Sequence, residues 1–423
     1  MRIYMRIITT LCLSLAMCAP ALAQPAPQPA AGDFALGERE KIVVVGDSIT
    51  AAGQYVLYIE AYLVTRFPER HFDVLNVGRS SETLSNLSEV DHPGRRPCLF
   101  TRFDADVADF APTVVVSCYG INDGIYHPFS QERLKAYQDG VGKLIAKVRG
   151  DLKARLLILT PPAYESGNPG QPDVRPEETY GYKRPFADYD QVMDKYAAWL
   201  MTLKEQGVTV EDLHTLMVRH LKARRQDTAG FRMTRDGIHP SSTGHLLMAM
   251  ATLKAWHAPA LVDEASIDAA GKKVKAGEVK DLQVQDGTVR FSWTSKVPMP
   301  VDGSWDPKSL AAARFTETLN RYRLAVAGLT GARYALFADD VEVGQFSGKD
   351  LAAGIDLTAL PKFPTTARSQ KILPLVRDHR KAGYAVFRKN YSGGPDARRA
   401  ALDAQLKALC KPATMAIRIA PAQ

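Results

Sequence analysis

Cysteine is scarce in this chain, and its few thiols form no pattern typical of a metal site. Five cysteines occur among 423 residues, and none stands in a Cys/His cluster with the spacing of a zinc site. Cys12 and Cys18 lie in an N-terminal segment discussed below, which leaves Cys98, Cys118 and Cys410. Cys98 and Cys118 either form a disulfide or remain buried thiols, and the sequence leaves both alternatives open. We expect neither a metal nor another cofactor.

Long apolar runs are also missing, apart from one near the start. Residues 7–17 are apolar, follow Arg2 and Arg6, and precede a small-residue stretch that ends at Ala23. This pattern is typical of a secretory signal peptide over residues 1–23, cleaved after Ala23, and it is too short for a permanent membrane anchor. We therefore predict an exported protein, periplasmic or extracellular, with no stable membrane insertion.

Blocks of a single charge are absent as well. The formal net charge is +8, with 24% charged residues, and no lysine- or arginine-rich run is interleaved with aromatic residues. The sequence therefore predicts no nucleic-acid partner. Loss of Arg2 and Arg6 with the signal peptide lowers the charge from +8 to +6. Such a mild excess either favours an acidic polysaccharide or merely keeps the surface soluble.

Alternating strand and helix patterns fill residues 40–257, after a Pro/Ala-rich linker at residues 24–39. The alternation predicts a parallel sheet covered by helices on both faces. The expected strands are Ile42–Gly46, Phe72–Val77, Thr113–Cys118, Arg155–Thr160 and Val208–Leu213. The expected helices are Tyr55–Phe67, Phe100–Phe110, Gln131–Arg149, Phe186–Gln206 and Ser241–His257.

Residues 258–423 have a different pattern and predict a smaller region of mixed α+β structure. Turn residues separate the paired apolar stretches 279–284 and 289–293, and also 334–338 and 341–346, so we expect two hairpins. Helical patterns follow at residues 368–389, with a kink or break expected at Pro374, and at residues 395–410. No chemical motif occurs in this extension, and its role stays open.

Polar motifs occur at four points that the predicted topology brings together. The motifs are Gly46-Asp47-Ser48, Asn76-Val77-Gly78-Arg79-Ser80-Ser81, Gly120-Ile121-Asn122-Asp123 and Asp236-Gly237-Ile238-His239-Pro240. The first three follow expected strands directly, and the last precedes the final helix of the α/β region. Because carboxyl ends of parallel strands meet at one edge of a sheet, these segments can form one site.

The residue types in these motifs suit nucleophilic catalysis. A serine hydroxyl such as that of Ser48 needs a base to take its proton, and His239 is suited to this role. Asp236 lies three residues before His239, close enough to hold the imidazole in one tautomer. Taken singly, each motif can equally be a turn or a helix cap.

An oxyanion that forms during acyl transfer needs hydrogen-bond donors. The backbone N–H groups of Ser48 and Gly78 and the side-chain amide of Asn122 are the expected donors. Asp47, Asp123 and Arg79 adjoin these residues and are expected to support the site.

Together the four motifs resemble those of the GDSL/SGNH hydrolase family over about residues 40–257. The resemblance implies a three-layer α/β/α, flavodoxin-like fold with about five parallel strands, and metal-free ester hydrolysis through an acyl-serine. It implies Ser48 as nucleophile, His239 as base, Asp236 as the orienting acid, and Gly78 and Asn122 as oxyanion donors. The extension after residue 257 departs from compact members of the family.

The substrate follows less directly. Export and the polar loops 79–98 and 161–189 favour a carbohydrate, so we expect a carbohydrate esterase that removes acetyl groups. The alternatives are a broad-specificity lipolytic or aryl esterase, an acyltransferase, and a non-enzymatic glycan-binding protein. Tyr164, Tyr180 and Tyr182 either stack on sugars or pin their loop. The polar residues after Gly78, together with Arg95 and Arg96 further on, either meet substrate or form internal ion pairs. The oligomeric state is not predicted.

Overall fold

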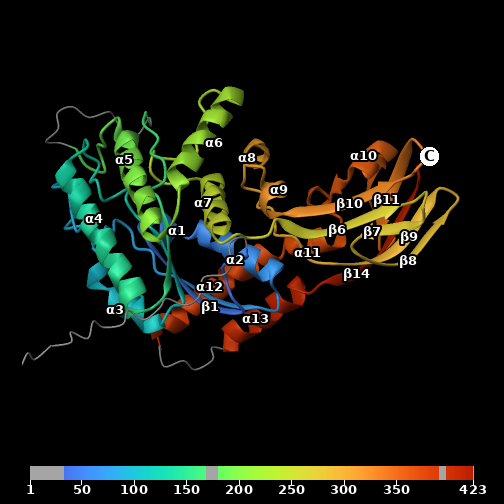
Figure 1. The fold of residues 1–423 in the computed structure, drawn as a ribbon, viewed down its shortest axis with the longest axis horizontal. Helices are drawn as coiled ribbons and strands as arrows, with labels where there is room; N and C mark the ends of the chain where they lie inside the picture. Colours follow the sequence, from blue (N-terminus) through green and yellow to red (C-terminus); the bar gives the residue numbers. More distant parts are fainter. Residues whose placement is uncertain (1–32, 168–179, 390–396, 423) are drawn as a thin grey trace, which may run out of the picture.

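The computed structural model describes residues 33–167, 180–389 and 397–422. The predicted signal peptide and the first part of the linker lie outside these residues. The described chain forms an α/β lobe followed by a lobe made mainly of strands, side by side along the long axis of the molecule (Figure 1). Helices from the end of the chain run back beneath the first lobe.

The α/β lobe is built on a five-stranded parallel sheet with the order β2-β1-β3-β4-β5. All five predicted strands are present, each within one or two residues of its expected bounds at most ends. They are β1 (Arg39–Gly46), β2 (His71–Asn76), β3 (Val114–Cys118), β4 (Arg155–Leu159) and β5 (Thr209–Glu211). Strand order reverses beside β1, between β2 and β3, so the loops after β1 and β3 diverge at a point where such sheets bind ligands.

Helices cover both faces of the sheet, which gives the predicted three layers. On one face α2 (Gln54–Arg66) packs against α7 (Ser242–Ala255). On the other, α4 (Gln131–Ile145) and α5 (Tyr189–Thr202) lie together (Figure 1). The rings of Tyr137 in α4 and Tyr196 in α5 stack with their centroids 5.0 Å apart. The inner strands β1, β3 and β4 are almost completely buried, because apolar residues face both helical layers, whereas the edge strand β2 is only partly buried.

Two helix predictions in this lobe differ from the structure. The expected helix over residues 100–110 is broken into short turns, with α3 (Phe103–Asp106) between the 3-10 turns Leu99–Thr101 and Ala108–Phe110. A helix that was not predicted, α6 (Leu213–Asp227), follows β5 and is capped by Asp212, whose side chain accepts a hydrogen bond from Thr215 N. Its many arginine and histidine residues masked the spacing of Leu213, Met217 and Leu221, which are buried.

The end of the predicted linker is part of the folded lobe. Leu36 is buried, and the ring of Phe34 stacks on Phe67 at 4.4 Å. Ala35 N also donates to Trp256 O, which ties the segment to the end of α7. The ordered lobe therefore starts before residue 40.

Two sheets pack face to face in the second lobe. One has four strands in the order β13-β10-β6-β7, and the other has five in the order β12-β11-β14-β9-β8. Buried side chains of both sheets form one apolar cluster separate from that of the first lobe. The strands are β6 (Leu261–Asp268), β7 (Lys273–Ala276), β8 (Glu278–Gln285), β9 (Thr288–Ser295), β10 (Arg321–Ala327), β11 (Arg333–Ala338), β12 (Val341–Ser347), β13 (Ile355–Asp356) and β14 (Ala413–Pro421). Both predicted hairpins, β8–β9 and β11–β12, are confirmed.

Shorter helices link the strands of this lobe. They are α8 (Pro307–Ala312), α9 (Phe315–Leu319), α10 (Gly348–Ala353) and α11 (Pro364–Ser369). The residue Trp305, just before α8, belongs to the apolar cluster of the first lobe.

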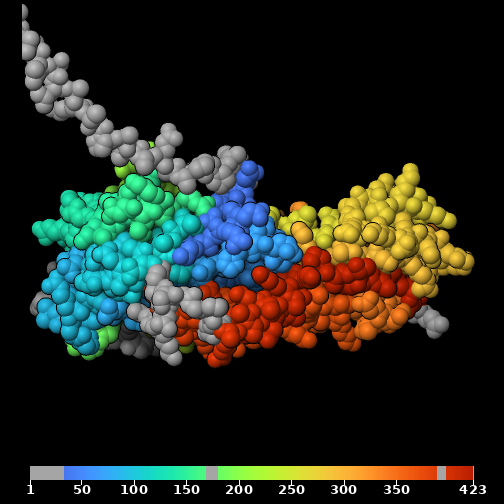
Figure 2. All heavy atoms as spheres, turned by 90° about the horizontal axis from the view of Figure 1, so that it is seen from below, coloured from blue at the N-terminus to red at the C-terminus, as the bar shows by residue number. Residues whose placement is uncertain are grey.

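The last two helices return to the first lobe. The helix α12 (Ile372–Lys389) packs on α2 and β2, and α13 (Ala397–Cys410) packs on α12 and α2. In Figure 2 they form a red band that joins the blue and cyan lobe to the strands beyond. Pro374 lies in the first turn of α12, where a missing N–H breaks no hydrogen bond, so the expected kink is absent. The break comes earlier, between α11 and α12.

Two expectations about covalent and membrane structure can be compared with the described residues. Cys98, Cys118 and Cys410 are free and buried, so the disulfide alternative is excluded and the buried-thiol alternative holds. Within the same residues, no helix combines the length and apolarity needed to cross a membrane.

Candidate active site

A chain of three hydrogen-bonded side chains lies at the carboxyl edge of the parallel sheet. The hydroxyl Oγ of Ser48 is 2.8 Å from Nε2 of His239, and Nδ1 of His239 is 2.6 Å from Oδ2 of Asp236. Ser48 and His239 are 191 residues apart in sequence and meet only through the fold. The predicted serine, histidine and aspartate are therefore in hydrogen-bond reach of one another in the order that acyl transfer requires.

The turn after β1 holds Ser48 at the start of a short helix. Asp47 caps α1 (Ser48–Ala52), since its side chain accepts a hydrogen bond from Ile49 N at 2.9 Å. Gly46 leaves room for this turn: a Cβ there would lie 2.7 Å from the carbonyl oxygen of Cys118. The backbone N–H of Ser48 thus belongs to the first turn of a helix, where N–H groups have no partner within the helix.

A second turn holds His239. One oxygen of Asp236 accepts hydrogen bonds from the backbone N–H groups of Ile238 and His239, at 3.0 and 2.7 Å, while the other meets the imidazole. Gly237 has φ +86, and a Cβ on it would lie 2.6 Å from Glu165 O, so the turn requires glycine.

Glu165 fastens this turn to the rest of the lobe and was not predicted. Its buried carboxylate accepts hydrogen bonds from Met233 N at 2.8 Å, Thr234 N at 2.6 Å and the Thr234 hydroxyl at 2.9 Å. It also pairs with Arg225 at 2.8 Å. Glu165 comes from the long loop after β4, where the sequence pattern indicated only a polar loop.

The electrostatics of the pair suit a general base. The hydrogen bond that His239 donates to Asp236 raises the pKa of His239 above its usual value, against the opposing effect of burial. Burial alone would raise the pKa of Asp236, but the hydrogen bonds from His239 hold it well below the usual range. Asp236 is therefore a carboxylate at neutral pH, and it stabilises the imidazolium that forms when His239 takes a proton.

One of the two amide hydrogens of Asn122 is donated to a backbone carbonyl, and the other is available to a ligand. Its Nδ2 donates to the carbonyl of Glu82 at 3.2 Å, which fixes the orientation of the amide, and its Oδ1 accepts from the hydroxyl of Tyr126 at 2.7 Å. Burial raises the pKa of Tyr126 far above its usual value, so this hydroxyl remains a donor. The second Nδ2 hydrogen has no recorded partner among the described residues.

Gly78 differs from its expected role. Its N–H donates to Oδ1 of Asn76 at 2.9 Å, so this group is not free to bind an oxyanion. The glycine is needed for another reason, because a Cβ would lie 2.4 Å from Ala51 N in α1. Three residues later Ser81 has φ +67, and its N–H has no recorded hydrogen bond within the described chain. The carbonyl of the next residue, Glu82, accepts a hydrogen bond from the side-chain amide of Asn122, so the Ser81 backbone lies beside Asn122.

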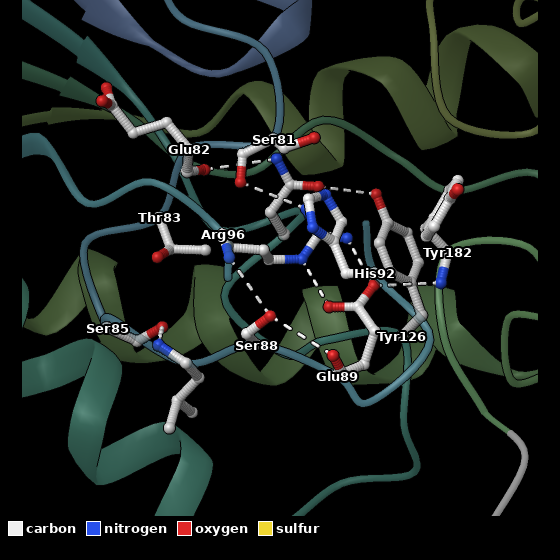
Figure 3. Close-up of polar contacts among 12 residues, drawn as sticks. Ser81, Glu82, Thr83, Ser85, Ser88, Glu89, His92, Arg96, Tyr126 and Tyr182 are labelled. Atoms are coloured by element: carbon white, nitrogen blue, oxygen red, sulfur yellow. Dashed lines mark hydrogen bonds and ion pairs between the residues drawn. The ribbon is translucent and has the colours of Figure 1, made fainter. Parts of the chain in front are cut away.

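A buried ion pair braces this loop and was not predicted as part of the site (Figure 3). Arg96 donates to both oxygens of Glu89 at 2.5 Å and to the carbonyl of Ser81 at 3.2 Å. Its guanidinium also lies over the ring of Tyr126, 5.5 Å from the centroid. Glu89 in turn accepts from Tyr182 N at 3.2 Å. Arg96 therefore supports the Ser81 backbone directly and Asn122 through Tyr126.

The alternatives left open for the polar loop are now distinguishable. Glu82 is buried, and its carboxylate accepts hydrogen bonds from Arg102 at 2.5 and 2.7 Å and from Tyr119 at 2.5 Å. Glu82 therefore belongs to an internal network. Arg79 and Ser80 instead are exposed. Tyr164 and Tyr180 are buried and pin their loop to the lobe, and Tyr182 is half-buried beside His92.

Two buried carboxyl groups lie beneath the site. Oδ1 of Asp123 accepts from Leu84 N at 2.8 Å and Ser85 N at 2.7 Å, which ties the loop after β3 to that after β2. Burial raises the pKa of Asp123 to about 6 and that of Asp47 to about 7. Within the described chain, no group of three or more His, Cys, Asp or Glu residues is arranged to hold a metal ion.

The three-layer α/β/α fold and the hydrogen-bonded serine, histidine and aspartate together define a hydrolase of the serine type. Residues 44–247 match the GDSL-like lipase/acylhydrolase family. This match identifies residues 44–247 as a GDSL-like lipase/acylhydrolase domain, and the protein is a carboxylic ester hydrolase. An acetylxylan esterase from Geobacillus stearothermophilus is 27% identical over 242 residues, which cover 52% of this chain and 94% of the relative.

The second lobe also has a counterpart among solved structures. A gut microbial diltiazem-metabolizing enzyme superposes with a TM-score of 0.75 and 21% identity, covering 92% of this chain and 98% of its own. At that identity the likeness concerns the fold. It extends the comparison beyond the hydrolase domain to the strands and helices after residue 257.

Proposed function

We propose that this protein is an exported carbohydrate esterase that removes acetyl groups through an acyl-serine intermediate. The observation that carries the proposal is the hydrogen-bonded chain from Ser48 through His239 to Asp236. The acetylxylan esterase relative supports the carbohydrate and the acetyl group. Exposed polar residues beside the site, Arg79 and Ser80, are consistent with a hydrophilic substrate.

In the first half of the reaction His239 Nε2 takes the hydroxyl proton of Ser48 as Oγ attacks the ester carbonyl. The resulting oxyanion accepts hydrogen bonds from Asn122 Nδ2 and from the backbone N–H groups of Ser48 and Ser81. His239 then gives its proton to the departing sugar oxygen, and the acetyl group remains on Ser48. Asp236 stabilises the imidazolium throughout.

In the second half a water molecule takes the place of the sugar. His239 accepts a proton from this water, the hydroxide attacks the acetyl-serine, and acetate leaves while the proton returns to Ser48 Oγ. The catalytic groups are all supplied by the chain, so the reaction needs no metal.

The test is release of acetate from acetylated xylan, acetylated pectin and small acetylated sugars, beside short- and long-chain p-nitrophenyl esters. We expect acetate from a saccharide and none from the Ser48→Ala variant. Hydrolysis of the synthetic esters alone would favour a broad-specificity esterase. Transfer of the acetyl group to an added sugar would favour an acyltransferase, and no turnover of any ester would favour a glycan-binding protein. Retention of activity in EDTA is expected, and a large loss would contradict the metal-free mechanism.

Export is a separate part of the proposal and rests on residues 1–23. The first residue of the mature protein tests it. N-terminal sequencing of protein recovered from outside the cytoplasm should begin at Gln24, whereas an intact Met1 would contradict cleavage after Ala23.

A further inference from the structure

A wide hollow lies beside the candidate active site, between the first lobe and the C-terminal extension. Its volume is about 720 Å³, and its walls include Ala51, Gly78 and Tyr58 on one side and α12 on the other. Ala51 is three residues after Ser48 in α1, about 4.5 Å along the helix axis. The hollow therefore begins less than one helical turn from the nucleophile.

Cations dominate the wall that the extension contributes. Arg377, Arg380 and Lys381 all line the hollow. Arg377, Lys381 and Tyr384 follow one another at i, i+4 and i+7, so they form one stripe along α12 that faces the hollow. Arg377 and Tyr384 are exposed, as is Lys381.

The three cations differ in how far other groups neutralise them. Arg380 is paired with the buried Glu60 at 2.9 Å and donates to Gly53 O at 2.7 Å, so it is a structural anchor. Lys381 approaches only Asp378, at 3.9 Å and with both side chains largely in solvent, where such a pair is weak. No ion pair of Arg377 is recorded among the described residues.

Among the described residues that line the hollow, Asp302 is the one acidic residue, against three cations, so the lining keeps an excess of positive charge. Its carboxylate accepts hydrogen bonds from Tyr58 Oη at 3.0 Å and from Ser304 N at 2.9 Å, which hold it in place. The lining also includes apolar surface from Leu57, Val74 and Tyr384. A hollow with apolar walls and two available cations suits a sugar ring that carries a carboxylate better than a small inorganic anion.

We propose that this hollow binds a uronic acid unit of an acidic polysaccharide, next to the acetylated unit whose ester Ser48 cleaves. The inference rests on the proposed carbohydrate esterase function and deepens it. It also gives the C-terminal extension a task, because Arg377 and Lys381 belong to α12 and not to the hydrolase domain. Exposed cations act weakly and are screened by salt, so the site favours acidic over neutral substrates by a modest factor.

Binding and turnover are measured separately, so that failure of this inference can be told from failure of the proposed function. The binding probe is an unacetylated xylo-oligosaccharide with one glucuronic acid branch, compared with the same oligosaccharide without the branch. The variant is Arg377→Gln with Lys381→Gln. A matched control is Lys280→Gln with Arg290→Gln, which removes two exposed cations from the second lobe.

We expect the wild-type protein to bind the branched probe about three- to tenfold more tightly than the unbranched one at low salt. The preference should vanish in the Arg377/Lys381 variant, and also for the wild type in about 0.5 M NaCl, because salt at this concentration screens exposed charges. It should persist in the control variant. Equal binding of both probes by wild type, or a preference that survives in the variant, would overturn the inference.

Turnover of p-nitrophenyl acetate and of the acetylated oligosaccharides completes the experiment. The neutral ester should be hydrolysed equally by all three proteins, and only the acidic oligosaccharide should show a raised KM in the Arg377/Lys381 variant. If the wild type does not hydrolyse the acetylated oligosaccharides but does prefer the branched probe in binding, the proposed esterase function is contradicted while the binding site is supported.

Discussion

Arg96 and Glu89 form a fully buried, bidentate ion pair whose remaining guanidinium N–H supports the backbone of Ser81. Buried pairs of this kind are costly to desolvate, and breaking one by removing a single partner leaves an unpaired charge. Here the pair lies between the loop after β2 and Tyr126, which holds Asn122. Its position indicates that it fixes the geometry of the oxyanion donors.

Replacement of Arg96 by lysine tests this relationship. Lysine keeps the charge but cannot form the planar fork that reaches Glu89 and Ser81 together. We expect kcat for p-nitrophenyl acetate to fall tenfold or more with little change in KM, because small displacements of catalytic groups cost up to about 10² in rate. Lys135→Ala, which removes an exposed cation paired with Asp139, is the control. An Arg96→Lys variant with full kcat would remove Arg96 from the site.

The amide of Asn122 should contribute directly to the rate. Asn122→Ala is expected to lower kcat on the order of 10²–10³ if the amide stabilises the oxyanion. Tyr126→Phe removes only the hydroxyl that orients the amide, so its loss should be smaller. Steady-state kinetics on one activated ester compares the two, and a loss below threefold in Asn122→Ala would exclude the amide from the mechanism.

The pH profile should report the state of His239. The base must be neutral to accept the Ser48 proton, so the rate is expected to rise with pH through the pKa of His239, which Asp236 raises above its usual value. Asp236→Asn removes the source of that shift. We expect its kcat/KM to be far lower and its residual profile to turn at a lower pH. An unchanged midpoint would show that another group sets the profile.

Asp47 provides a prediction on stability. Burial raises its pKa to about 7, so the folded state holds the proton more tightly than the unfolded state. An acid with a raised pKa in the folded state destabilises the protein progressively as pH rises from its unfolded pKa to about 7. Asp47→Asn keeps an oxygen for the Ile49 N–H and should therefore be more stable than wild type at pH 8, by on the order of 2–4 kcal/mol.

That advantage should shrink as the pH falls toward 4, where the unfolded carboxyl also becomes protonated. Denaturant unfolding of both proteins at several pH values measures it. A difference that does not depend on pH would mean that Asp47 is not a buried charge at neutral pH.

Removal of the extension should damage the hydrolase lobe. Ile372, Leu373 and Val376 of α12 are buried in the same apolar cluster as the parallel sheet. A chain ending at residue 257 exposes that surface, so we expect an insoluble or loosely folded product, judged by soluble yield and by cooperativity of thermal unfolding. A soluble, active fragment would mean that the extension is only accessory.

Much of the first lobe could be predicted from the sequence, because the patterns that indicate its strands and its catalytic residues are local. Short β-branched runs and the Gly, Ser, Asn and His motifs at their ends predict the strands and the chain from Ser48 to Asp236. The oxyanion donors were harder, since the hydrogen bond from Gly78 N to Asn76 and the left-handed backbone of Ser81 depend on neighbours that a motif does not contain. For Arg96 the sequence left open whether it meets substrate or forms an internal ion pair, and the pair with Glu89 is internal. Glu89 and Glu165 were missed, because their importance comes from burial and an isolated Glu in a polar loop gives no sign of it.

The second lobe was less predictable. The hairpins had turn residues at their centres, whereas β10 and β6 pair in parallel across 60 residues, and their register has no local signature. In the first lobe, the basic residues of the helix α6 obscured its apolar pattern, although its buried side chains recur every three to four positions.

The position of β14 has a consequence for biosynthesis. This strand (Ala413–Pro421) comes after all the other strands in sequence, yet it lies in the middle of its five-stranded sheet, between β11 and β9. The sheet cannot close until residues 413–421 have been synthesised, while the strands of the hydrolase lobe emerge far earlier. Until then, the hairpins β8–β9 and β11–β12 each have an unpaired strand edge, and such edges can pair with other chains. A chain that lacks residues 413–421 therefore loses the central strand of this sheet.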